Sequence, residues 1–220
     1  MTGRSALLVA DDLGYDPAID AGILEAHRHG VVAAASALVT GPFAMGALER
    51  APRSLAIGLH LDLPRGLGAS DAEREIRAQF GRFEEIRGAP PAHVDGHRHV
   101  HAEPPVLEAL LRVAGPLGLR VRALDPIMRD RIRAAGARAC DAFVGDAGLR
   151  PCWTVERLVT AVGALSEGTT EIMLHPGRTP THVRTSFGAE REIELAAAID
   201  PRVREAFLVA GVSVVGLLPG

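Results

Sequence analysis

The chain has 220 residues, 47% of them hydrophobic, and a formal net charge of −3. This length can bury one sizeable core and no change in composition divides it, so we expect a single domain over residues 1–220. The charge gives no overall basic field, which argues against nucleic acid as a partner. All 24 basic residues are arginine, which excludes Schiff-base catalysis and a P-loop lysine.

Targeting signals are absent from the pattern. No apolar run approaches the length of a membrane span, and the apolar stretch 6–10 is cut short by Asp11, before it could form a signal peptide. We therefore expect a cytoplasmic protein without a membrane span. The two cysteines, Cys140 and Cys152, fit no metal or redox spacing and are expected to be reduced thiols.

Short apolar runs alternate with helical patterns along the chain. Turn residues separate them, for example Pro17, which is typical of a helix start, and Gly30 and Gly118, which are typical of helix ends. The apolar runs predict strands at 6–10, 33–39, 55–59, 93–101, 121–123, 139–144, 171–174 and 212–217. Helices are predicted at 17–29, 44–51, 71–87, 104–117, 126–135, 154–165 and 189–208.

This alternation indicates an α/β fold with a parallel sheet and right-handed crossovers. Eight strands favour a single-domain parallel β/α barrel, TIM-like in regular or distorted form, over an open doubly wound sheet.

The stretch 93–101 holds four of the nine histidines and one carboxylate. If it is extended, His93, Asp95, His97, His99 and His101 point to one face and valines to the other. Five such positions span roughly 27 Å, so only a subset can share one ion. A solvated histidine tract is the alternative, but the position between two predicted helices and the valines on the reverse face favour burial.

Several polar residues fall at the carboxyl ends of different predicted strands, where parallel barrels keep their active sites. They are Asp11, Asp12, His60, Asp95, His97 and His175. One carboxylate and two imidazoles from separate strands make a three-ligand site with an open position for water. We choose Asp12, His60 and His97 as the ligands, a set that suits zinc and other transition ions.

Two neighbours of this site could carry protons. Asp11 could accept the proton of the water, and His175 could protonate a leaving group. Simpler readings are an N-cap role for the aspartate pair and a core role for His60. Rival functions are a phosphoesterase with two bridged metals and a basic clamp, and a non-catalytic domain with a closed four-ligand metal site.

Four segments occur in the order of one known family. Ala-Asp-Asp-Leu-Gly (10–14), Gly-Leu-His-Leu (58–61), His-Val-Asp-Gly-His-Arg-His-Val-His (93–101) and Leu-His-Pro-Gly (174–177) together resemble the YdjC-like carbohydrate deacetylases. The sequence departs from the family pattern at Leu13 and Gly96, where Phe and Ser are usual. The segment between His60 and the next helix is short, which predicts an open substrate mouth.

The resemblance implies a β/α-barrel hydrolase that removes acetyl from an N-acetylated sugar with one divalent metal ion, Mg²⁺ or Zn²⁺. It implies the same ligands, Asp12, His60 and His97, with Asp11 as base and His175 as acid. Substrate contacts are expected from Arg191, a position that the resemblance places near the site, and from Asp95 and Tyr15. A homo-oligomer is left open.

Overall fold

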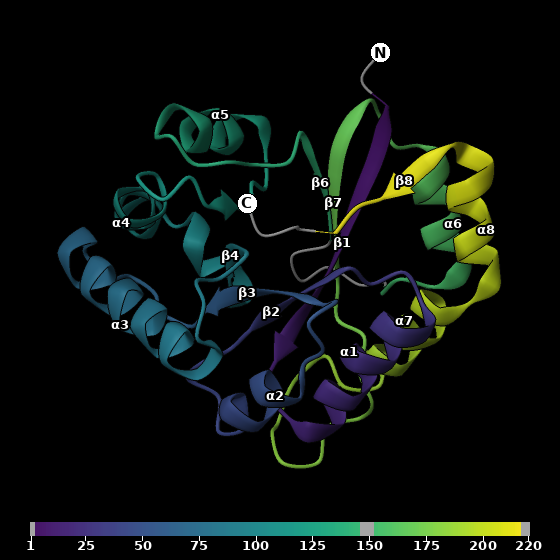
Figure 1. The fold of residues 1–220 in the computed structure, drawn as a ribbon, viewed down its shortest axis with the longest axis horizontal. Coiled ribbons are helices and arrows are strands. Elements are labelled where there is room, and N and C mark those ends of the chain that lie inside the picture. Colours follow the sequence, from purple (N-terminus) through teal and green to yellow (C-terminus); the bar gives the residue numbers. More distant parts are fainter. Residues whose placement is uncertain (1–2, 146–151, 217–220) are drawn as a thin grey trace.

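The computed structural model describes residues 3–145 and 152–216. Its centre is a sheet of parallel strands with helices packed around its outer side (Figure 1). The strands are β1 (Arg4–Leu13), β2 (Ala34–Ala37), β3 (Ala56–Leu61), β4 (His93–Gly96), β5 (Arg120–Val121), β6 (Ala142–Val144), β7 (Gly168–Leu174) and β8 (Val212–Val214). Each lies where the sequence predicts a strand, although residue 217 of the last predicted strand lies outside the described residues.

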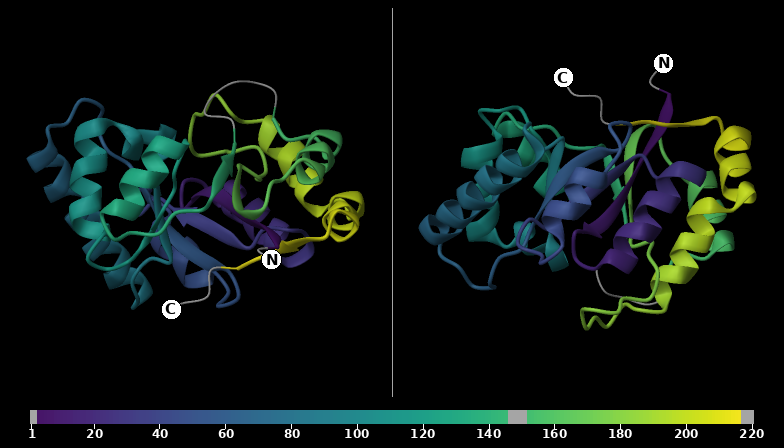
Figure 2. Two further views of the ribbon diagram at one scale, coloured as in Figure 1. Left: turned by 90° about the horizontal axis from the view of Figure 1, so that it is seen from above. Right: turned by 60° about the horizontal axis from the view of Figure 1, so that its bottom comes forward.

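Pairing follows the order β5-β4-β3-β2-β1-β7-β6, and β8 also pairs with β1. Since β7 runs along one edge of β1, the other edge is shared: β8 pairs with its first residues, Arg4 to Ala6, and β2 with its second half from Val9. The outer strands β5 and β6 do not pair with each other within the described residues; β5 makes one isolated bridge, Arg120 to Arg138, with the segment before β6. The predicted parallel barrel is confirmed in a distorted, half-closed form (Figure 2).

The helices are α1 (Pro17–His29), α2 (Ala44–Arg50), α3 (Ala69–Arg87), α4 (Pro104–Ala114), α5 (Pro126–Ala134), α6 (Val155–Gly163), α7 (Glu190–Ile199) and α8 (Pro201–Ala210). The prediction of one helix over 189–208 is wrong. Asp200 adopts an extended conformation and its carboxylate caps Arg202 N, while Pro201 lacks the N–H that a continuous helix would need. None of the helices in the described ranges is long and apolar enough to cross a membrane.

Local sequence explains most of the helix starts. Asp16 and Asp125 each cap a helix with the side chain, and a proline follows each at the first helical position. Strands β1 and β2 lie side by side at the centre of the sheet and place small side chains in the core. Ala6, Ala10 and Ala35 are fully buried in the main core, whereas Ala34 is fully buried in a separate cluster with Leu7 and Val9.

The prediction of one extended strand over 93–101 is also wrong. Strand β4 ends at Gly96, and His97–Ala102 form a short 3₁₀ segment, η1, in which Arg98 and His99 have φ of 51° and 57°. This left-handed pair turns the chain, so the histidines do not alternate along one strand face. His97 is thereby separated from His99 and His101.

Candidate active site

Strand β1 ends in two aspartates that face different partners. The register between β1 and β2 is interrupted between Ala10 and Leu13, and Asp12 has φ of 76°. A left-handed conformation is uncommon for a residue with a side chain and is found at functional sites more often than elsewhere. A regular strand would send the side chains of Asp11 and Asp12 to opposite faces. Here both lie beside His60, so the altered backbone turns the Asp12 side chain toward the same side as Asp11.

Asp12 meets two histidines. Its Oδ1 lies 3.1 Å from His97 Nδ1 and 3.5 Å from His60 Nε2, and one ligand atom from each of the three residues lies within 4.8 Å of the others. Asp12 and His60 are buried, whereas the His97 side chain is 22% exposed. One carboxylate and two imidazoles, brought together from β1, β3 and η1, are a donor set that fits a divalent ion with an open position.

Charged neighbours fix the protonation and direction of these groups. Burial alone would raise the pKa of the Asp12 carboxyl, but the Arg191 guanidinium and the two histidines hold it well below its usual value. Burial opposes protonation of His60, yet Asp95 and Asp11 raise the pKa of His60 to about 10. Because a metal binds only the neutral imidazole, metal binding at His60 would release this proton.

Asp95 orients the His60 ring through a hydrogen bond to its other nitrogen. His60 Nδ1 donates to Asp95 Oδ1 over 2.7 Å, which leaves Nε2 directed at Asp12. Asp95 is fully buried and also accepts from Ser36 Oγ at 2.7 Å. It does not line the cavity above the site, so the expectation that it contacts substrate is not supported by its position.

Arg122 is a central residue that the sequence reasoning missed. It is fully buried, and its two terminal nitrogens lie 2.7 and 2.8 Å from the oxygens of Asp11. The same guanidinium contacts Asp95 Oδ2 at 2.6 Å and Glu171 Oε1 at 2.5 Å. A signal was present: Arg122 directly follows β5, at the same carboxyl end as the other polar residues.

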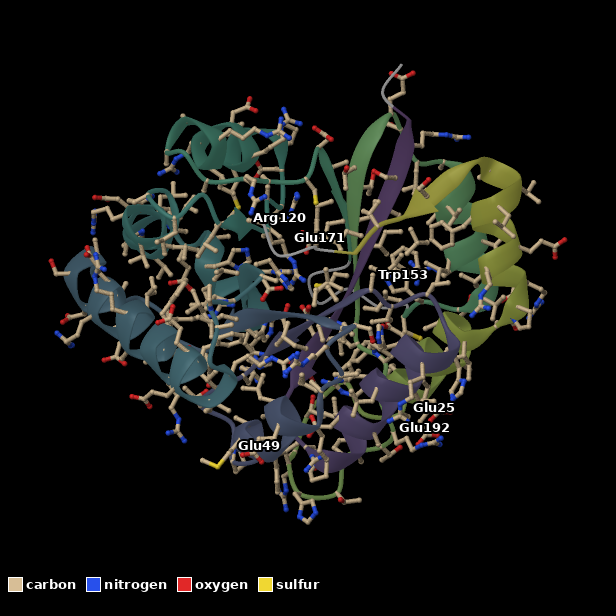
Figure 3. All side chains as sticks on the ribbon, in the orientation of Figure 1. Glu25, Glu49, Arg120, Trp153, Glu171 and Glu192 are labelled. Carbon is tan, nitrogen blue, oxygen red and sulfur yellow. The ribbon has the colours of Figure 1, made fainter. Side chains whose placement is uncertain are left out.

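Glu171 lies in the middle of the molecule, whereas Glu25, Glu49 and Glu192 lie at its periphery (Figure 3). Burial raises the pKa of the Glu171 carboxyl, and Arg122 opposes that rise. Two buried arginines thus contact four buried carboxylates at the centre of the barrel: Arg122 contacts Asp11, Asp95 and Glu171, and Arg191 contacts Asp12. This excess of negative charge would favour a bound cation.

A cavity of about 1000 Å³ opens over the aspartate and histidine groups. Ligand sites are commonly of this size and combine apolar walls with a few polar groups. We call it the main cavity; its wall includes Asp11, Asp12, Tyr15, His60, His97, His99, Trp153, His175, Phe187, Arg191 and Glu194. The rings of Tyr15 and His97 lie 5.9 Å apart, and those of His175 and Phe187 lie 5.3 Å apart.

Helix α7 holds two sides of this cavity. Arg191 Nη2 donates to Asp12 Oδ2 over 2.6 Å and its Nε donates to Phe187 O. Arg191 thereby fixes the orientation of the Asp12 carboxylate. One turn later, Glu194 accepts from the backbone N–H of His175 at 2.6 Å and of Trp153 at 3.1 Å. The sequence reasoning missed Glu194, although its spacing from Arg191 puts both on one helix face.

The remaining histidines of the rich stretch lie outside the trio of Asp12, His60 and His97. His93 Nε2 lies 2.9 Å from Ser36 Oγ. His101 is fully buried, and neither of its ring nitrogens has a hydrogen-bond partner among the described residues. Burial lowers the pKa of His93 and His99 to about 4 and that of His101 to about 3, so all three are neutral.

Fold and site define a class: parallel β/α barrels with a carboxylate–imidazole cluster at the carboxyl ends of the strands. The family model described as YdjC-like protein matches residues 6–70 and 65–208. The chain belongs to this YdjC-like family.

Known relatives and structures agree with this family. A carbohydrate deacetylase of Geobacillus stearothermophilus is 29% identical and 96% of each chain is covered. A carbohydrate deacetylase of Brevibacillus brevis is 31% identical, with 84% of this chain and 87% of the relative covered. A crystal structure from Enterococcus faecalis V583, named for cellobiose-phosphate cleavage, has a TM-score of 0.85, 26% identity and 98% coverage of both chains. A family 4 acetyl xylan esterase from Clostridium thermocellum, in complex with a cobalt ion, shares the fold: TM-score 0.61, 16% identity, 97% and 88% coverage.

Proposed function

We propose that the chain is a metal-dependent hydrolase that removes the N-acetyl group from an acetylated amino sugar or oligosaccharide. The observation that carries this proposal is the convergence of Asp12, His60 and His97 at the main cavity, with Asp11 beside them and His175 on the wall. Relatives that cover nearly the whole chain are named carbohydrate deacetylase and chitooligosaccharide deacetylase, which supports the substrate class.

Asp12, His60 and His97 would hold one divalent ion. When bound, such an ion polarises the acetyl carbonyl and makes a water molecule more acidic. Zinc suits the two imidazoles and magnesium suits the carboxylate, and both remain candidates. Arg191 on one oxygen of Asp12 leaves the other oxygen free to face the histidines.

Asp11 and His175 would move the protons. Hydrolysis breaks the amide C–N bond and adds water: Asp11 accepts a proton from the attacking water, and His175 gives one to the departing amine nitrogen. The bidentate contact with Arg122 fixes the Asp11 carboxylate, and Glu194 anchors the backbone at His175. Tyr15 and Arg191 line the cavity where the sugar would lie.

The same contacts weigh against the phosphoesterase alternative. A second group of potential ligands, Asp11, His60 and Asp95, is close enough for an ion. However, Arg122 binds both oxygens of Asp11 and one oxygen of Asp95, whereas Arg191 binds only one oxygen of Asp12. The second group therefore has fewer oxygens available to an ion than the group that contains Asp12. The group of Asp12, His60 and His97 also has three protein donors, whereas a closed, non-catalytic site usually has four.

The test is a panel of N-acetylated mono-, di- and oligosaccharides, acetylated lipid-linked sugars and phosphate esters, incubated with metal-loaded enzyme. We expect free acetate in a one-to-one ratio with new amine. Release of phosphate without acetate would support the phosphoesterase instead. Turnover of none of these compounds, with no exchangeable water in the cobalt-substituted protein, would support the metal-binding domain.

A further inference from the structure

His97 has the least side-chain support of the three candidate metal ligands. Among the described residues, the only hydrogen-bond partner of its ring is Asp12, itself a candidate ligand. The ring of His60, in contrast, is buried and is oriented by Asp95. A histidine that binds a metal usually has a partner at its other ring nitrogen, which fixes the direction of the ring. The direction of the His97 ring therefore depends on packing beside Tyr15 and on the backbone that carries it.

The backbone next to His97 is strained. His97 is the first residue of η1, and the two residues that follow, Arg98 and His99, have φ of 51° and 57°. A left-handed conformation costs an ordinary residue about 1–2 kcal/mol. Two such residues in succession need support from the surrounding structure. Relaxation of this turn would change the direction in which the His97 side chain leaves the backbone.

Arg65, in the segment between β3 and α3, provides this support. Its Nη2 donates to the carbonyl oxygen of Arg98 over 3.0 Å, and its Nη1 lies 2.9 Å from Glu103 Oε1. The backbone N–H of Gly66 donates to the other carboxylate oxygen of Glu103 at 3.1 Å. We call Arg65 and Glu103 the turn clamp. A planar guanidinium can hold both partners in one fixed geometry, which the single ammonium of a lysine cannot do.

Both sides of the turn clamp are attached to the outer helices. Glu103 is the N-cap residue of α4, and its carbonyl oxygen accepts from Leu107 N at 2.8 Å. On the other side, the Gln79 side chain of α3 bonds both backbone groups of Asp62, which precedes Arg65 in the same segment. Helices α3 and α4 pack against each other. The clamp thus connects the strained turn to a rigid pair of helices.

The turn clamp contributes little to the stability of the fold as a whole. The Arg65 side chain is 65% exposed, and an exposed ion pair usually contributes less than about 1 kcal/mol. Its contact with the turn beside a candidate ligand indicates a local role instead. Resting on the proposed metal-dependent function, we infer that Arg65 and Glu103 are positioning residues for His97. They hold the left-handed turn, so that the His97 imidazole stays directed at the ion held by Asp12 and His60.

The test measures the dissociation constant of zinc for chelator-treated protein, by competition with a chromogenic chelator. We expect Glu103→Ala and Arg65→Lys each to weaken zinc binding about threefold to tenfold, which corresponds to about 0.7–1.4 kcal/mol. The loss arises because part of the binding free energy must then restore the turn. The urea midpoint of the metal-free protein should change little, since the ion pair is exposed.

Arg98→Gly distinguishes support of the turn from other effects of the clamp. Glycine adopts a left-handed backbone without the cost that a side chain adds, so the turn should no longer need the clamp. In the Arg98→Gly background, we expect Glu103→Ala to change the zinc dissociation constant by less than about twofold. A loss of equal size in both backgrounds would overturn the inference.

The matched control is Glu108→Ala. It breaks another exposed ion pair of α4, to Arg112 at 2.7 Å, and lies outside the wall of the main cavity. Its zinc affinity should equal that of the unmodified protein. An equal loss of affinity in Glu108→Ala and Glu103→Ala would overturn the positioning role, and so would unchanged zinc binding by Glu103→Ala.

Zinc binding and acetate release separate this inference from the proposed function. If the unmodified protein binds zinc but releases no acetate, the deacetylase proposal fails, and weaker zinc binding by Glu103→Ala still supports the positioning role. If acetate is released and Glu103→Ala binds zinc normally, the positioning role fails alone. Absence of zinc binding by the unmodified protein overturns the positioning role, whatever the acetate assay shows.

Discussion

Adjacent aspartates at the end of β1 have been given separate environments. Asp11 is bound in bidentate fashion by Arg122 and Asp12 is bound by Arg191 and faces two histidines. The sequence shows that two carboxylates lie at the end of this strand. The family resemblance implies that Asp12, and not Asp11, is the metal ligand beside the histidines. The sequence does not reveal Arg122, which lies 111 residues away from Asp11. The family resemblance places Arg191 near the site as a substrate contact, but not its contact with Asp12, 179 residues away.

This separation predicts different outcomes for two isosteric substitutions. Asp11→Asn should keep the metal but lower kcat by about 10²–10⁴-fold, because an amide cannot accept the proton of water. Asp12→Asn should lose metal affinity, since the amide carries no charge for the ion. Metal content by mass spectrometry, measured beside acetate release, distinguishes them. If the two variants exchange phenotypes, the assignment of base and ligand is reversed.

Asp20, on α1, is a buried carboxylate whose ionisation lowers the stability of the folded state. Gly14 N donates to its Oδ1 at 2.6 Å, while Oδ2 has only a long contact to Arg50 at 3.6 Å. Burial raises the pKa of Asp20 to about 6. The folded state therefore binds more protons than the unfolded state between about pH 4 and 6, and stability falls as pH rises through this window.

Asp20→Asn should remove this cost, because the amide oxygen can still accept from Gly14 N. We expect stabilisation of about 1–2 kcal/mol at pH 8 and little or none at pH 4, measured by urea unfolding. Asp130→Asn, at an exposed site, is the control and should change neither value. A gain of equal size at both pH values would show that ionisation of Asp20 is not its source.

At the scale of elements, alternation of apolar runs was enough to predict all eight strands. It failed where a local feature overrides periodicity. The histidine stretch has the alternation of a strand, but a left-handed turn at Arg98 and His99 ends the strand. The sequence does not indicate this turn, because neither residue is glycine, the type that favours a left-handed backbone. The break between α7 and α8 could have been predicted, because Asp200 and Pro201 repeat the pattern of Asp16 and Pro17.

Among the histidines near the candidate site, we expect the position of each ring, and not the residue type, to decide whether it binds the metal. His60→Ala and His97→Ala should each lose the bound metal and activity together, because two protein ligands hold an ion too weakly. His101→Phe should retain metal, since His101 belongs to neither ligand group and loses no hydrogen bond. Mass spectrometry of the purified proteins measures this. Retention of full metal in His97→Ala would remove His97 from the ligands.

Asp16 joins α1 to the segment between β7 and α7. Its Oδ1 caps Ala18 N, and its Oδ2 lies 2.7–3.3 Å from the backbone nitrogens of residues 181–183. That segment continues to Phe187 on the wall of the main cavity. The helix cap and the cavity wall thus depend on one carboxylate.

Asp16→Ala should make the segment between β7 and α7 more mobile while the barrel stays folded. The substitution removes only the hydrogen bonds from the Asp16 carboxylate to the backbone nitrogens of Ala18 and of residues 181–183. We expect faster tryptic cleavage after Arg178 or Arg184, with destabilisation of about 1–3 kcal/mol. Asp125→Ala removes the equivalent cap of α5 away from the segment, and should destabilise without exposing these two sites. Unchanged cleavage in Asp16→Ala would show that other contacts hold the segment.

For the whole molecule, the half-closed barrel explains why the charges gather where they do. The carboxyl ends of β1, β3 and β4 and the first residue after β5 converge, and they bring Asp11, Asp12, His60, Asp95 and Arg122 together. Burying so many carboxylates is unfavourable unless cations compensate them, and two arginines compensate only in part. A divalent ion at Asp12, His60 and His97 would complete the balance.

The central claim is that one metal ion at this position makes the chain a deacetylase. The most direct measurement is acetate release by chelator-treated protein as zinc or magnesium is added back. We predict no activity before addition, a linear rise, and a plateau at about one equivalent of the active metal. The two ligand groups found among the described residues share His60, and Arg122 occupies both oxygens of Asp11 in the second group, whereas Asp12 keeps one oxygen toward the histidines. Full activity in the metal-free protein, or a rise that continues to two equivalents, would contradict the account.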